Sequence, residues 1–462
     1  MRGILACFLA MIVTQALPAA DRPNVVLVLA DDLGISDLGC YGNTFHETPN
    51  IDKLARDGIR LTNAYSACTV CSPTRAALMT GQYPARLHIT DWIAGHVKPF
   101  AKLSVPDWTM RLDPTIYTMP RAFKEAGYVT ASMGKWHLGG PDAYPEKHGF
   151  DLNIAGTDKG QPPSYFSPYK IATLKDGPAG ELITDRLASE ACRWIEANRE
   201  KPFFLYLPQF AVHTPLQGKK EVVEKYRRKM ATMDQTRAGV MNPTYAALLE
   251  GLDDSVGTIR KKLDELKLTD NTIFIFTSDN GGLLGNAKNP ITSNPPYRAG
   301  KGSAYEGGVR VPLIVSYPAS LKSKTGTNDQ SFITMDLFPT LASFCGLTSV
   351  KSHRLDGKDK RNELLGLERS KDYLYWHYPH YHPGGATPYS AVLSPDRYRL
   401  IAFFEDDHVE LYNLKADVGE KTDLAATMPD KAKELRDNLH AWRKSVGAQL
   451  PTKNPKYDPA KK

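Results

Sequence analysis

Residues 24–32 have the sequence Asn24-Val-Val-Leu-Val-Leu-Ala30-Asp31-Asp32, an unbroken apolar run that ends in two carboxylates. The β-branched residues in this run are typical of a strand that is buried on both faces, as in a parallel sheet. In an open α/β sheet, ligands bind outside the carboxyl ends of the strands, which is where Asp31 and Asp32 stand. The stretch therefore predicts both a class of fold and the edge of the sheet at which a site would form.

Apolar runs alternate with helical patterns along the following part of the chain. Thr48-Pro49 and Thr118-Met-Pro120 each combine a capping residue with a proline suited to the first helical turn, and Gly58 and Gly127 follow as stops. Further helices are expected near residues 181–198 and 244–266, and strands over residues 128–133, 203–207 and 272–277. This alternation predicts an α/β fold with a large mixed, mostly parallel sheet sandwiched by helices.

The pattern changes near residue 350. Short strand-like runs follow one another closely at residues 372–377, 390–393, 398–404 and 409–413. A last helix is expected from Pro429, with one apolar face made of Leu435, Leu439, Trp442 and Val446. We therefore predict a main domain over residues 21–349 and a C-terminal subdomain over residues 350–462, made of a small antiparallel sheet plus a helix.

Composition and charge exclude several classes of protein. The chain has 462 residues, of which 42% are apolar and 24% charged, and its 35 Gly and 33 Pro are scattered without a period. Disorder, collagen and coiled coil are therefore excluded. The net charge of +7 is not gathered into runs, so we expect no nucleic-acid partner.

The N-terminus has the features of a secretory signal over residues 1–20. Arg2 supplies a positive charge, residues 4–13 form an apolar core, and Ala16-Leu-Pro-Ala-Ala20 offers a small-residue cleavage site. The alternative is a buried N-terminal strand. No later uncharged run is long enough to span a bilayer. We predict a secreted or periplasmic protein without stable membrane insertion.

Five cysteines remain once the signal is removed: Cys40, Cys68, Cys71, Cys192 and Cys345. An odd number at irregular spacing does not indicate a disulfide framework, and an odd cysteine in an exported protein is worth testing for special chemistry. No Asn-x-Ser/Thr acceptor is present, because Asn242-Pro-Thr244 is excluded by its proline. This favours a bacterial periplasmic or extracellular setting.

Oxygen-bearing side chains follow two of the expected strands. Asp31 and Asp32 follow the first, and Asp279 and Asn280 follow the strand over residues 272–277. Three carboxylates and an amide at strand ends suit a hard cation such as Ca²⁺ or Mg²⁺. The alternative is that these residues only form turns and caps, as Asp-Asn-Gly-Gly at residues 279–282 would.

The stretch Cys71-Ser-Pro-Thr-Arg75-Ala-Ala-Leu-Met-Thr80-Gly81 decides between these alternatives. A cysteine at a helix N-terminus beside an arginine is electrostatically activated. The stretch resembles the signature of the sulfatase family, Cys-x-Pro-Ser/Thr-Arg followed by four residues and Thr-Gly. Gly127-Tyr-Val-Thr-Ala-Ser-Met-Gly134-Lys135-Trp136-His137 is similar to the family's second signature, and His213-Thr-Pro215 and Gly300-Lys301 with the residues up to Arg310 are similar to further family blocks. The resemblance, which is to arylsulfatase A-like members, extends from residue 24 to beyond residue 410.

The resemblance implies an alkaline phosphatase-like fold and a chemical change at Cys71. In this family a separate maturation enzyme oxidises the cysteine to formylglycine, whose hydrate carries two hydroxyls on one carbon. One hydroxyl attacks the sulfur of a sulfate ester, and deprotonation of the other expels sulfate and restores the aldehyde. The alternative is that Cys71 is a buried structural thiol.

The resemblance also implies a role for each matching residue. Asp31, Asp32, Asp279 and Asn280 are expected to bind one Ca²⁺, which also touches the modified Cys71. Arg75 is expected to hold the hydrate, and Lys135 and Lys301 to contact sulfate oxygens. His137 is the expected base in sulfate release, and His213 the expected proton donor to the departing alcohol. The roles match positions in the family blocks; Arg310 also matches, with a role that could be purely structural.

Substrate contacts are less clearly marked in the sequence. The family often has another polar sulfate contact shortly after residues 149–157, for which Thr157 and Asp158 are candidates. Tyr375-Trp-His-Tyr-Pro-His-Tyr-His382 gathers aromatic and imidazole groups, which suit a sugar ring, so His377 and His380 are candidate substrate contacts. A core or edge-strand role explains these aromatics equally well. The expected substrate is a sulfated carbohydrate of galactose or N-acetylgalactosamine type.

Two other functions compete with this interpretation. One is a phosphate or phosphonate ester hydrolase of the same superfamily, whose two-metal members need a second set of Asp and His ligands that we do not find in the sequence. The other is a non-catalytic carbohydrate-binding relative, against which the presence of every charged position named above argues.

Overall fold

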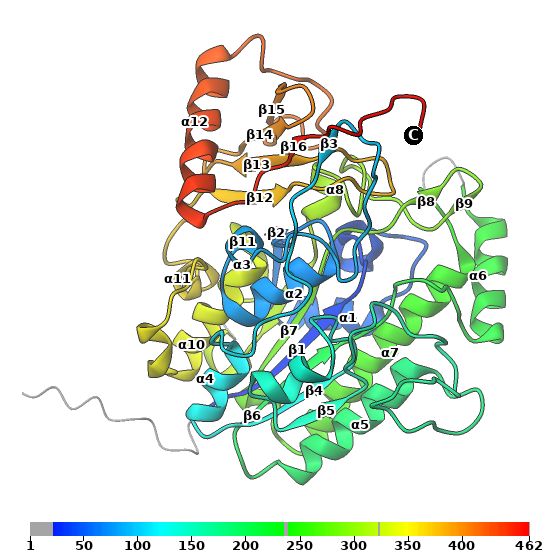
Figure 1. Cartoon of the computed structure of the whole chain (residues 1–462). Helices are drawn as coiled ribbons and strands as arrows, with labels where there is room; N and C mark the ends of the chain where they lie inside the picture. The colour runs from blue at the N-terminus through cyan, green and yellow to red at the C-terminus, as the bar shows by residue number, and fades with distance from the viewer. Residues whose placement is uncertain (1–21, 235–238, 322–323, 462) are drawn as a thin grey trace, which may run out of the picture.

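A computed structural model describes residues 22–234, 239–321 and 324–461, so the predicted signal over residues 1–20 lies outside the described residues. The strands of the main sheet are β1 (Asn24–Ala30), β2 (Ile59–Tyr65), β4 (Val129–Met133), β5 (Leu152–Ile154), β6 (Phe203–Pro208), β7 (Thr272–Ser278), β10 (Leu313–Ser316) and β11 (Gly326–Ile333). Their order is β11-β2-β10-β7-β1-β6-β4-β5 (Figure 1). Strand β10 runs antiparallel to β2 and β7, and the other neighbouring pairs are parallel. The prediction of a mixed, mostly parallel sheet is confirmed.

Helices cover both faces of this sheet because its central strands are apolar on both sides. In β1, Val26 and Val28 pack with α1 (Pro49–Asp57), α5 (Ile183–Ala197) and α7 (Pro243–Glu265). Val25, Leu27 and Leu29 point the other way, toward α2 (Cys71–Thr80), α4 (Met119–Glu125) and α10 (Leu337–Cys345). Successive side chains of a strand point to opposite faces, so one continuous apolar run supplies two cores.

Local sequence sets the ends of the helices that matter for the site. The Asn242 side chain accepts hydrogen bonds from Thr244 N and Tyr245 N, at 3.0 and 3.1 Å, and Pro243 follows at the first helical position of α7. Helix α2 ends at Gly81, whose φ of 67° lets its N–H donate to Ala77 O at 2.8 Å.

A second, four-stranded antiparallel sheet lies above the main sheet in Figure 1. Its strands are β12 (Leu374–Tyr378), β13 (Tyr389–Leu393), β14 (Tyr398–Phe403) and β15 (Val409–Asn413), in that order. Helix α12 (Pro429–Val446) packs on it with Leu435, Leu439, Trp442 and Val446 buried. The predicted C-terminal sheet and helix are confirmed.

The two sheets share a hydrophobic core. Tyr65 and Ala77 of the main part lie in one apolar cluster with Trp376 and Leu400 of the C-terminal part. The indole N–H of Trp376 donates to Ser66 O at 2.8 Å across this contact. The C-terminal strands therefore pack directly behind the loop that leads into α2; the division near residue 350 stays a prediction.

The remaining elements are short or peripheral. They are α3 (Pro84–Leu87), α6 (Lys220–Thr232), α8 (Glu306–Val309), α9 (Pro318–Leu321) and α11 (Arg361–Leu364), with the strand pairs β3 (Leu103–Ser104) and β16 (Thr452–Lys453), and β8 (Gly285–Asn286) and β9 (Asn289–Pro290). Short 3₁₀ helices cover Ile35–Asp37, Gly39–Tyr41, Pro141–Ala143, Pro145–His148, Thr269–Asn271, Thr334–Asp336 and Thr348–Ser352.

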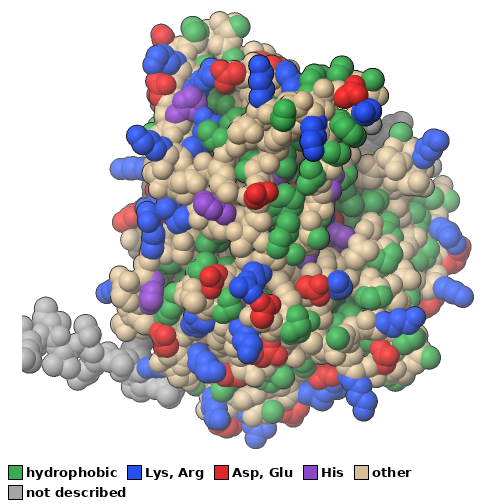
Figure 2. Space-filling model, in the orientation of Figure 1, with side chains coloured by type: hydrophobic (Ala, Val, Ile, Leu, Met, Phe, Trp, Pro, Cys, Tyr) green, Lys and Arg blue, Asp and Glu red, His purple; other side chains and the backbone are tan. Residues whose placement is uncertain are grey.

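The surface carries charges of both signs, and the cysteines are not paired in the described part of the chain. Figure 2 shows Lys and Arg side chains interspersed with Asp and Glu over the face in view. Of the helices in the described part of the chain, none combines the length and the apolar character that crossing a membrane requires. The five cysteines in these ranges are all free thiols.

Candidate active site

Four neighbouring parallel strands end at the same edge of the main sheet. Predicted site residues follow each of them within five residues: Lys135 and His137 after β4, His213 after β6, Asp31 and Asp32 after β1, and Asp279 and Asn280 after β7. Each strand end is held by a neighbour, as when Asp279 N donates to Ala30 O at 3.1 Å. The parallel topology therefore brings together residues that are far apart in the sequence.

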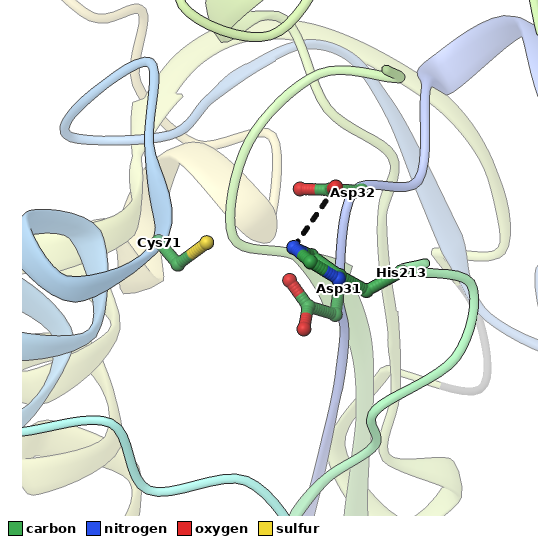
Figure 3. Close-up of side chains that lie close together, drawn as sticks. All are labelled: Asp31, Asp32, Cys71 and His213. Atoms are coloured by element: carbon green, nitrogen blue, oxygen red, sulfur yellow. Dashed lines mark ion pairs between the residues drawn. The ribbon is translucent and has the colours of Figure 1, made fainter. Parts of the chain in front are cut away.

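Cys71 is the first residue of α2 and is buried, with 2% of its surface exposed. Its Sγ and one ligand atom each of Asp31, Asp32 and His213 all lie within 4.8 Å of one another. Figure 3 shows the sulfur pointing toward these three side chains. Cys71 and the acidic strand ends thus form one site.

The hydroxyls beside Cys71 tie the start of α2 to other loops. Thr74 Oγ1 accepts a hydrogen bond from Cys68 N at 3.0 Å. Ser72 Oγ donates to His137 O at 2.9 Å and accepts from Ile93 N at 3.1 Å. These small polar residues fix the position of Cys71 relative to His137.

One half of the charge cluster joins Asp31 and Asp279 to two cations. Lys135 Nζ donates to Asp31 Oδ2 at 2.7 Å. Arg75 donates from Nε and Nη2 to Asp279 Oδ2 at 2.9 and 2.7 Å, and from Nη1 to Lys135 O at 2.8 Å. All four side chains are buried. Arg75 is therefore oriented by a carboxylate and by the backbone of Lys135.

The other half of the cluster is centred on Asp32. Lys301 Nζ lies 2.7 Å from Asp32 Oδ1 and 2.9 Å from its Oδ2. Asn280 Nδ2 donates to Asp32 Oδ1 at 2.8 Å, and His213 Nε2 lies 3.6 Å from Asp32 Oδ2. Asp32 N in turn donates to Asp279 Oδ1 at 3.2 Å, which connects the two halves.

Burial and neighbouring charges shift the pKa values of these groups in opposite directions. Burial raises the pKa of Asp31 to about 8, with Asp279 adding to the effect. Burial also acts on Asp32, but Lys301 and His213 outweigh it and hold the pKa of Asp32 below its usual range. Burial raises the pKa of the Cys71 thiol to about 11, so the thiol before conversion is protonated near neutral pH. The activation expected from its place at a helix N-terminus beside Arg75 is therefore wrong for the thiol, because burial outweighs the neighbouring positive charges.

Two site residues have backbone conformations that non-glycine residues seldom adopt. Asp32 has a φ of 60° and His137 a φ of 58°, both in the left-handed region. Such conformations persist where the surrounding contacts impose them, and they cluster at functional sites. Gly134, with φ of 131°, permits a close approach between β4 and β6, since a Cβ there would lie 1.9 Å from Pro208 O. This approach allows Lys135 N to donate to Pro208 O at 2.7 Å.

The hydrogen bonds of His137 assign its tautomer. Its Nε2 contacts the carbonyl oxygen of Ile93 and therefore carries a proton. Its Nδ1 is buried and has no hydrogen-bond partner in the described part of the chain. Burial and Lys135 hold the pKa of His137 well below its usual range, so the ring is neutral and Nδ1 is a free acceptor.

A cavity of about 390 Å³ opens onto this site. It is lined by four of the predicted residues, namely Cys71, His137, His213 and Lys301. The remaining lining residues are Trp92, Ile93, Ala94, Gly160, Gln161, Leu283, His382 and Pro383. Trp92, Gln161 and His382 were not among the predicted residues. His382 belongs to the aromatic segment identified in the sequence, whereas nothing in the sequence distinguished Trp92 or Gln161.

His377 and His380, the two histidines predicted to contact substrate, lie outside this cavity. His377 is in β12, where its ring nitrogens contact Ser390 Oγ at 2.7 Å and Gln449 O at 2.8 Å. His380 Nε2 contacts Thr90 Oγ1 at 2.8 Å, and its ring packs on Trp108 with a centroid separation of 4.9 Å. Both are buried, and of the histidines in this segment His382 is the one that lines the cavity.

The other candidates from the sequence also lie away from the cavity lining. Thr157 is buried and contributes its carbonyl oxygen to His137 N at 2.9 Å, while Asp158 pairs with exposed Lys159 at 2.9 Å. Arg310 pairs with Glu306 at 2.8 Å and with the carbonyl oxygen of Thr62 at 2.9 Å, which is a structural role.

The donor set fits a hard cation. Asp31 Oδ1 and Asn280 Oδ1 are buried and have no hydrogen-bond partner among residues 22–234, 239–321 and 324–461. Leaving such oxygens unpaired is costly, and carboxylate and amide oxygens are the ligands that Ca²⁺ and Mg²⁺ prefer. Together with Asp32 beside Cys71, they offer oxygen ligands for a cation at this edge of the sheet.

The comparisons with known proteins agree with this geometry. The Sulfatase family model matches residues 23–347, and the model of the N-sulphoglucosamine sulphohydrolase C-terminal region matches residues 300–445. A protein named Sulfatase from Formosa agariphila is 32% identical, covering 92% of this chain and 89% of the relative.

Two further relatives cover nearly the whole chain. An N-acetylgalactosamine-6-O-sulfatase from Bacteroides thetaiotaomicron is 29% identical, covering 91% of this chain and 93% of that protein. The crystal structure of Ps i-CgsB in complex with k-i-k-neocarrahexaose has a TM-score of 0.76 and 27% identity, covering 94% of both chains. The chain thus belongs to the Sulfatase family and is a sulfuric ester hydrolase with an alkaline phosphatase-like fold.

Proposed function

We propose that this sulfatase hydrolyses sulfate esters on a carbohydrate, with a sulfated galactose or N-acetylgalactosamine unit as its substrate. One observation carries the proposal: Cys71 at the start of α2 lies within 4.8 Å of Asp31, Asp32 and His213 beside a cavity. The N-acetylgalactosamine-6-O-sulfatase relative and the carbohydrate-bound Ps i-CgsB support the choice of substrate.

A modified residue, formylglycine, and a bound Ca²⁺ complete the proposed site. Cys71 would be converted to formylglycine by a maturation enzyme, and Asp31, Asp32, Asp279, Asn280 and the modified residue would hold one Ca²⁺. The aldehyde hydrate supplies the nucleophile, and the cation supplies stabilisation of negative charge on the sulfuryl group. The unpartnered oxygens of Asp31 and Asn280 support this set of ligands.

The cations of the site bind and orient the sulfate group. Lys301 lines the cavity beside Cys71, and its pKa is raised by its pairing with Asp32 against the effect of burial, so it stays charged. Lys135 and Arg75 are fixed by Asp31 and Asp279 before substrate arrives. Preorganised charges of this kind stabilise a transition state without the cost of reorientation.

The two cavity histidines move protons at different atoms. His137 Nδ1 is the unprotonated, partnerless nitrogen described above, which suits the base that releases sulfate. His213 Nδ1 lies 2.7 Å from Thr214 O and therefore carries a proton, so Nε2, on the Asp32 side, is unprotonated in the neutral ring. Nε2 is the atom that exchanges a proton with the departing alcohol, and it must first take up that proton, which burial opposes and the nearby Asp32 carboxylate favours.

Leaving-group dependence tests the role of His213. In His213→Ala, hydrolysis of a sulfated N-acetylgalactosamine should fall at least about 100-fold, since its alkoxide needs a proton to depart. Hydrolysis of 4-nitrophenyl sulfate should fall far less, since nitrophenolate departs without one. Equal losses on both substrates would contradict the assignment. Turnover of a phosphate diester above that of the sulfate ester would contradict the substrate class.

Mass spectrometry of the peptide covering residues 65–75 tests the modification. Conversion replaces the thiol of Cys71 by an aldehyde, and its mass change is expected when the protein is made with a maturation enzyme. For the location, we propose export to the periplasm or medium, which amino-terminal sequencing of the secreted protein would check by the loss of residues 1–20.

A further inference from the structure

A second cavity, of about 600 Å³, adjoins the one that contains Cys71. The two cavities share four lining residues, Leu283, Lys301, His382 and Pro383. Both volumes lie in the range of about 300–1,000 Å³ typical of cavities that hold a small organic ligand. The second cavity is bounded by the residues around β8, the loop before α8, the loop after β12 and the end of β14.

The walls of the second cavity suit a sugar ring. Tyr305, Tyr389 and Phe403 supply aromatic surface, and Asn286 and Thr387 supply polar groups. Tyr305 is held in place by its hydroxyl, which donates to Glu410 Oε2 at 2.9 Å, and by Arg298, 3.6 Å from its ring centroid. An aromatic body with a few polar groups is the usual composition of a specific ligand site.

Charge in the second cavity is arranged to accept an anionic neighbour. Among the described residues that line it there is no Asp or Glu, and Lys301 is the one charged lysine. Burial lowers the pKa of His382 to about 4, so this ring is neutral near pH 7. A sulfated or carboxylated sugar therefore meets no carboxylate there.

His382 stands between the two cavities and presents a donor. Its Nδ1 accepts a hydrogen bond from Gly384 N at 3.0 Å, so in the neutral ring the proton is on Nε2. The ring lies against the Lys301 loop at Gly302, where a Cβ would be 2.1 Å from His382 Nδ1. Gly302, with a φ of +83°, thus permits the position of the histidine.

We propose that the second cavity binds the sugar next to the sulfated unit, so that the enzyme acts on oligosaccharides in preference to monosaccharides. The inference rests on the proposed function and assigns its substrate a length. The aromatic wall at Phe403 packs on the neighbouring sugar, and His382 Nε2 donates to an oxygen between the two units. Continuity of the cavities through Lys301 and His382 places the two sugars in one chain.

The test compares kcat/KM for N-acetylgalactosamine 6-sulfate and for a chondroitin 6-sulfate tetrasaccharide. The tetrasaccharide should be preferred at least about tenfold, and Phe403→Ala should reduce this ratio about fivefold, since packing on an aromatic ring contributes on this scale. Ala386→Trp, which fills the same cavity, should reduce it as well. Phe404→Ala is the matched control: this half-buried ring packs on His377 and is not part of the cavity wall.

Each result decides between the inference and the function it rests on. A tetrasaccharide-to-monosaccharide ratio of kcat/KM near one in the wild-type enzyme would overturn the second sugar site and leave the proposed function standing. A ratio that neither Phe403→Ala nor Ala386→Trp changes would do the same. Hydrolysis of 4-nitrophenyl sulfate without turnover of either carbohydrate would overturn the proposed substrate, and this inference with it.

Discussion

Two of the buried charge clusters in the described part of the chain are built differently. The site cluster consists of Asp31, Asp32, Asp279, Arg75, Lys135 and Lys301, with Asn280 beside it. The interface cluster consists of Glu306, Arg310, Arg399 and Glu420, and joins α8 of the main part to β14 of the C-terminal sheet. Both bury ions, which is costly unless each ion is paired and hydrogen-bonded.

The interface cluster is closed on itself. Glu306 Oε1 lies 2.7 Å from Arg399 and its Oε2 lies 2.8 Å from Arg310. Glu306 N donates to Glu420 Oε2 at 2.7 Å. The atoms left without a hydrogen bond, Arg399 Nε and Glu420 Oε1, face each other at 3.6 Å.

The site cluster is open. Its leftover atoms are Asn280 Oδ1 and Asp31 Oδ1, which have no hydrogen-bond partner in the described part of the chain. Asp31 Oδ1 lies 3.8 Å from Arg75 Nη2, but this nitrogen already donates to Asp279 Oδ2 at 2.7 Å, and Asp31 is next to Cys71. The difference teaches that buried charge can serve either cohesion or binding. A cluster that satisfies itself stabilises the fold, whereas one that leaves acceptors unpaired beside a cavity stabilises a ligand.

The largest effect is expected from Cys71→Ala, next to the site cluster. Removal of a covalent nucleophile should lower kcat on 4-nitrophenyl sulfate at least about 10⁴-fold, with the circular dichroism spectrum unchanged. Cys68→Ala is the matched control, a buried thiol three residues away, and should retain kcat within about threefold. Comparable activity in the two variants would show that Cys71 is not the nucleophile.

Asp31→Asn tests whether the open acceptors bind a cation. Loss of a ligand should lower kcat/KM about 100-fold or more. In the wild-type protein, millimolar CaCl₂ should raise the Tm by about 2 °C or more, because a ligand that binds only the folded state stabilises it. Asp31→Asn should lack this rise in Tm, and a chelator should abolish the rise in the wild-type protein. A Ca²⁺-dependent rise that persists in Asp31→Asn would exclude Asp31 as a ligand.

Arg399→Met tests the closed cluster. Removing Arg399 leaves the buried Glu306 carboxylate paired with Arg310 alone, which should lower the free energy of unfolding in urea by about 3–5 kcal/mol. The Ca²⁺-dependent rise in Tm should survive, and kcat should stay within about threefold. If Arg399→Met instead abolished the response to Ca²⁺ at full stability, the separation of the two clusters would fail.

Glu420→Gln should give the smallest effect at low pH and a diagnostic pH dependence. Burial raises the pKa of Glu420 to about 8, so the folded state holds a proton that the unfolded state has released. The stability from this proton is present below the usual carboxyl pKa and is lost as the pH rises through about 8. Near pH 5 the free energy of unfolding of Glu420→Gln should differ from that of the wild-type protein by less than about 1 kcal/mol.

Urea unfolding from pH 5 to pH 9 measures this difference. As the pH rises through this range, the wild-type protein should lose stability relative to Glu420→Gln, because the amide of Gln has no proton to release. Parallel curves for the two proteins would mean that Glu420 is ionised throughout.

Local signals in the sequence predicted most of the main fold and the core of the site. The run Asn24–Ala30 forms β1 as expected, and Asp31, Asp32, Asp279 and Asn280 meet at one edge of the sheet. Such predictions succeed because a strand buried on both faces has an unmistakable apolar pattern and because parallel strands end together. Four predicted residues line the cavity with Cys71 among them.

Contacts between segments that are far apart in the sequence were not predictable in the same way. His377, His380 and His382 are alike in sequence, but His377 falls within β12 and His380 packs on Trp108, while His382 reaches the cavity. The position of each histidine depends on where β12 ends and on how the C-terminal sheet packs on the main sheet. Trp92 and Gln161 reach the cavity from loops without a pattern of their own.

The sequence by itself determined the motif around Cys71, the order of strands and helices, and the oxygen and nitrogen groups available for chemistry, because each of these is encoded within a short segment. Only the tertiary structure decided which charges pair with one another, which oxygens remain unpaired, and which histidine lines the cavity. These depend on distances between segments up to hundreds of residues apart, as between Asp32 and Asn280, and such distances are set by packing and not by any one segment.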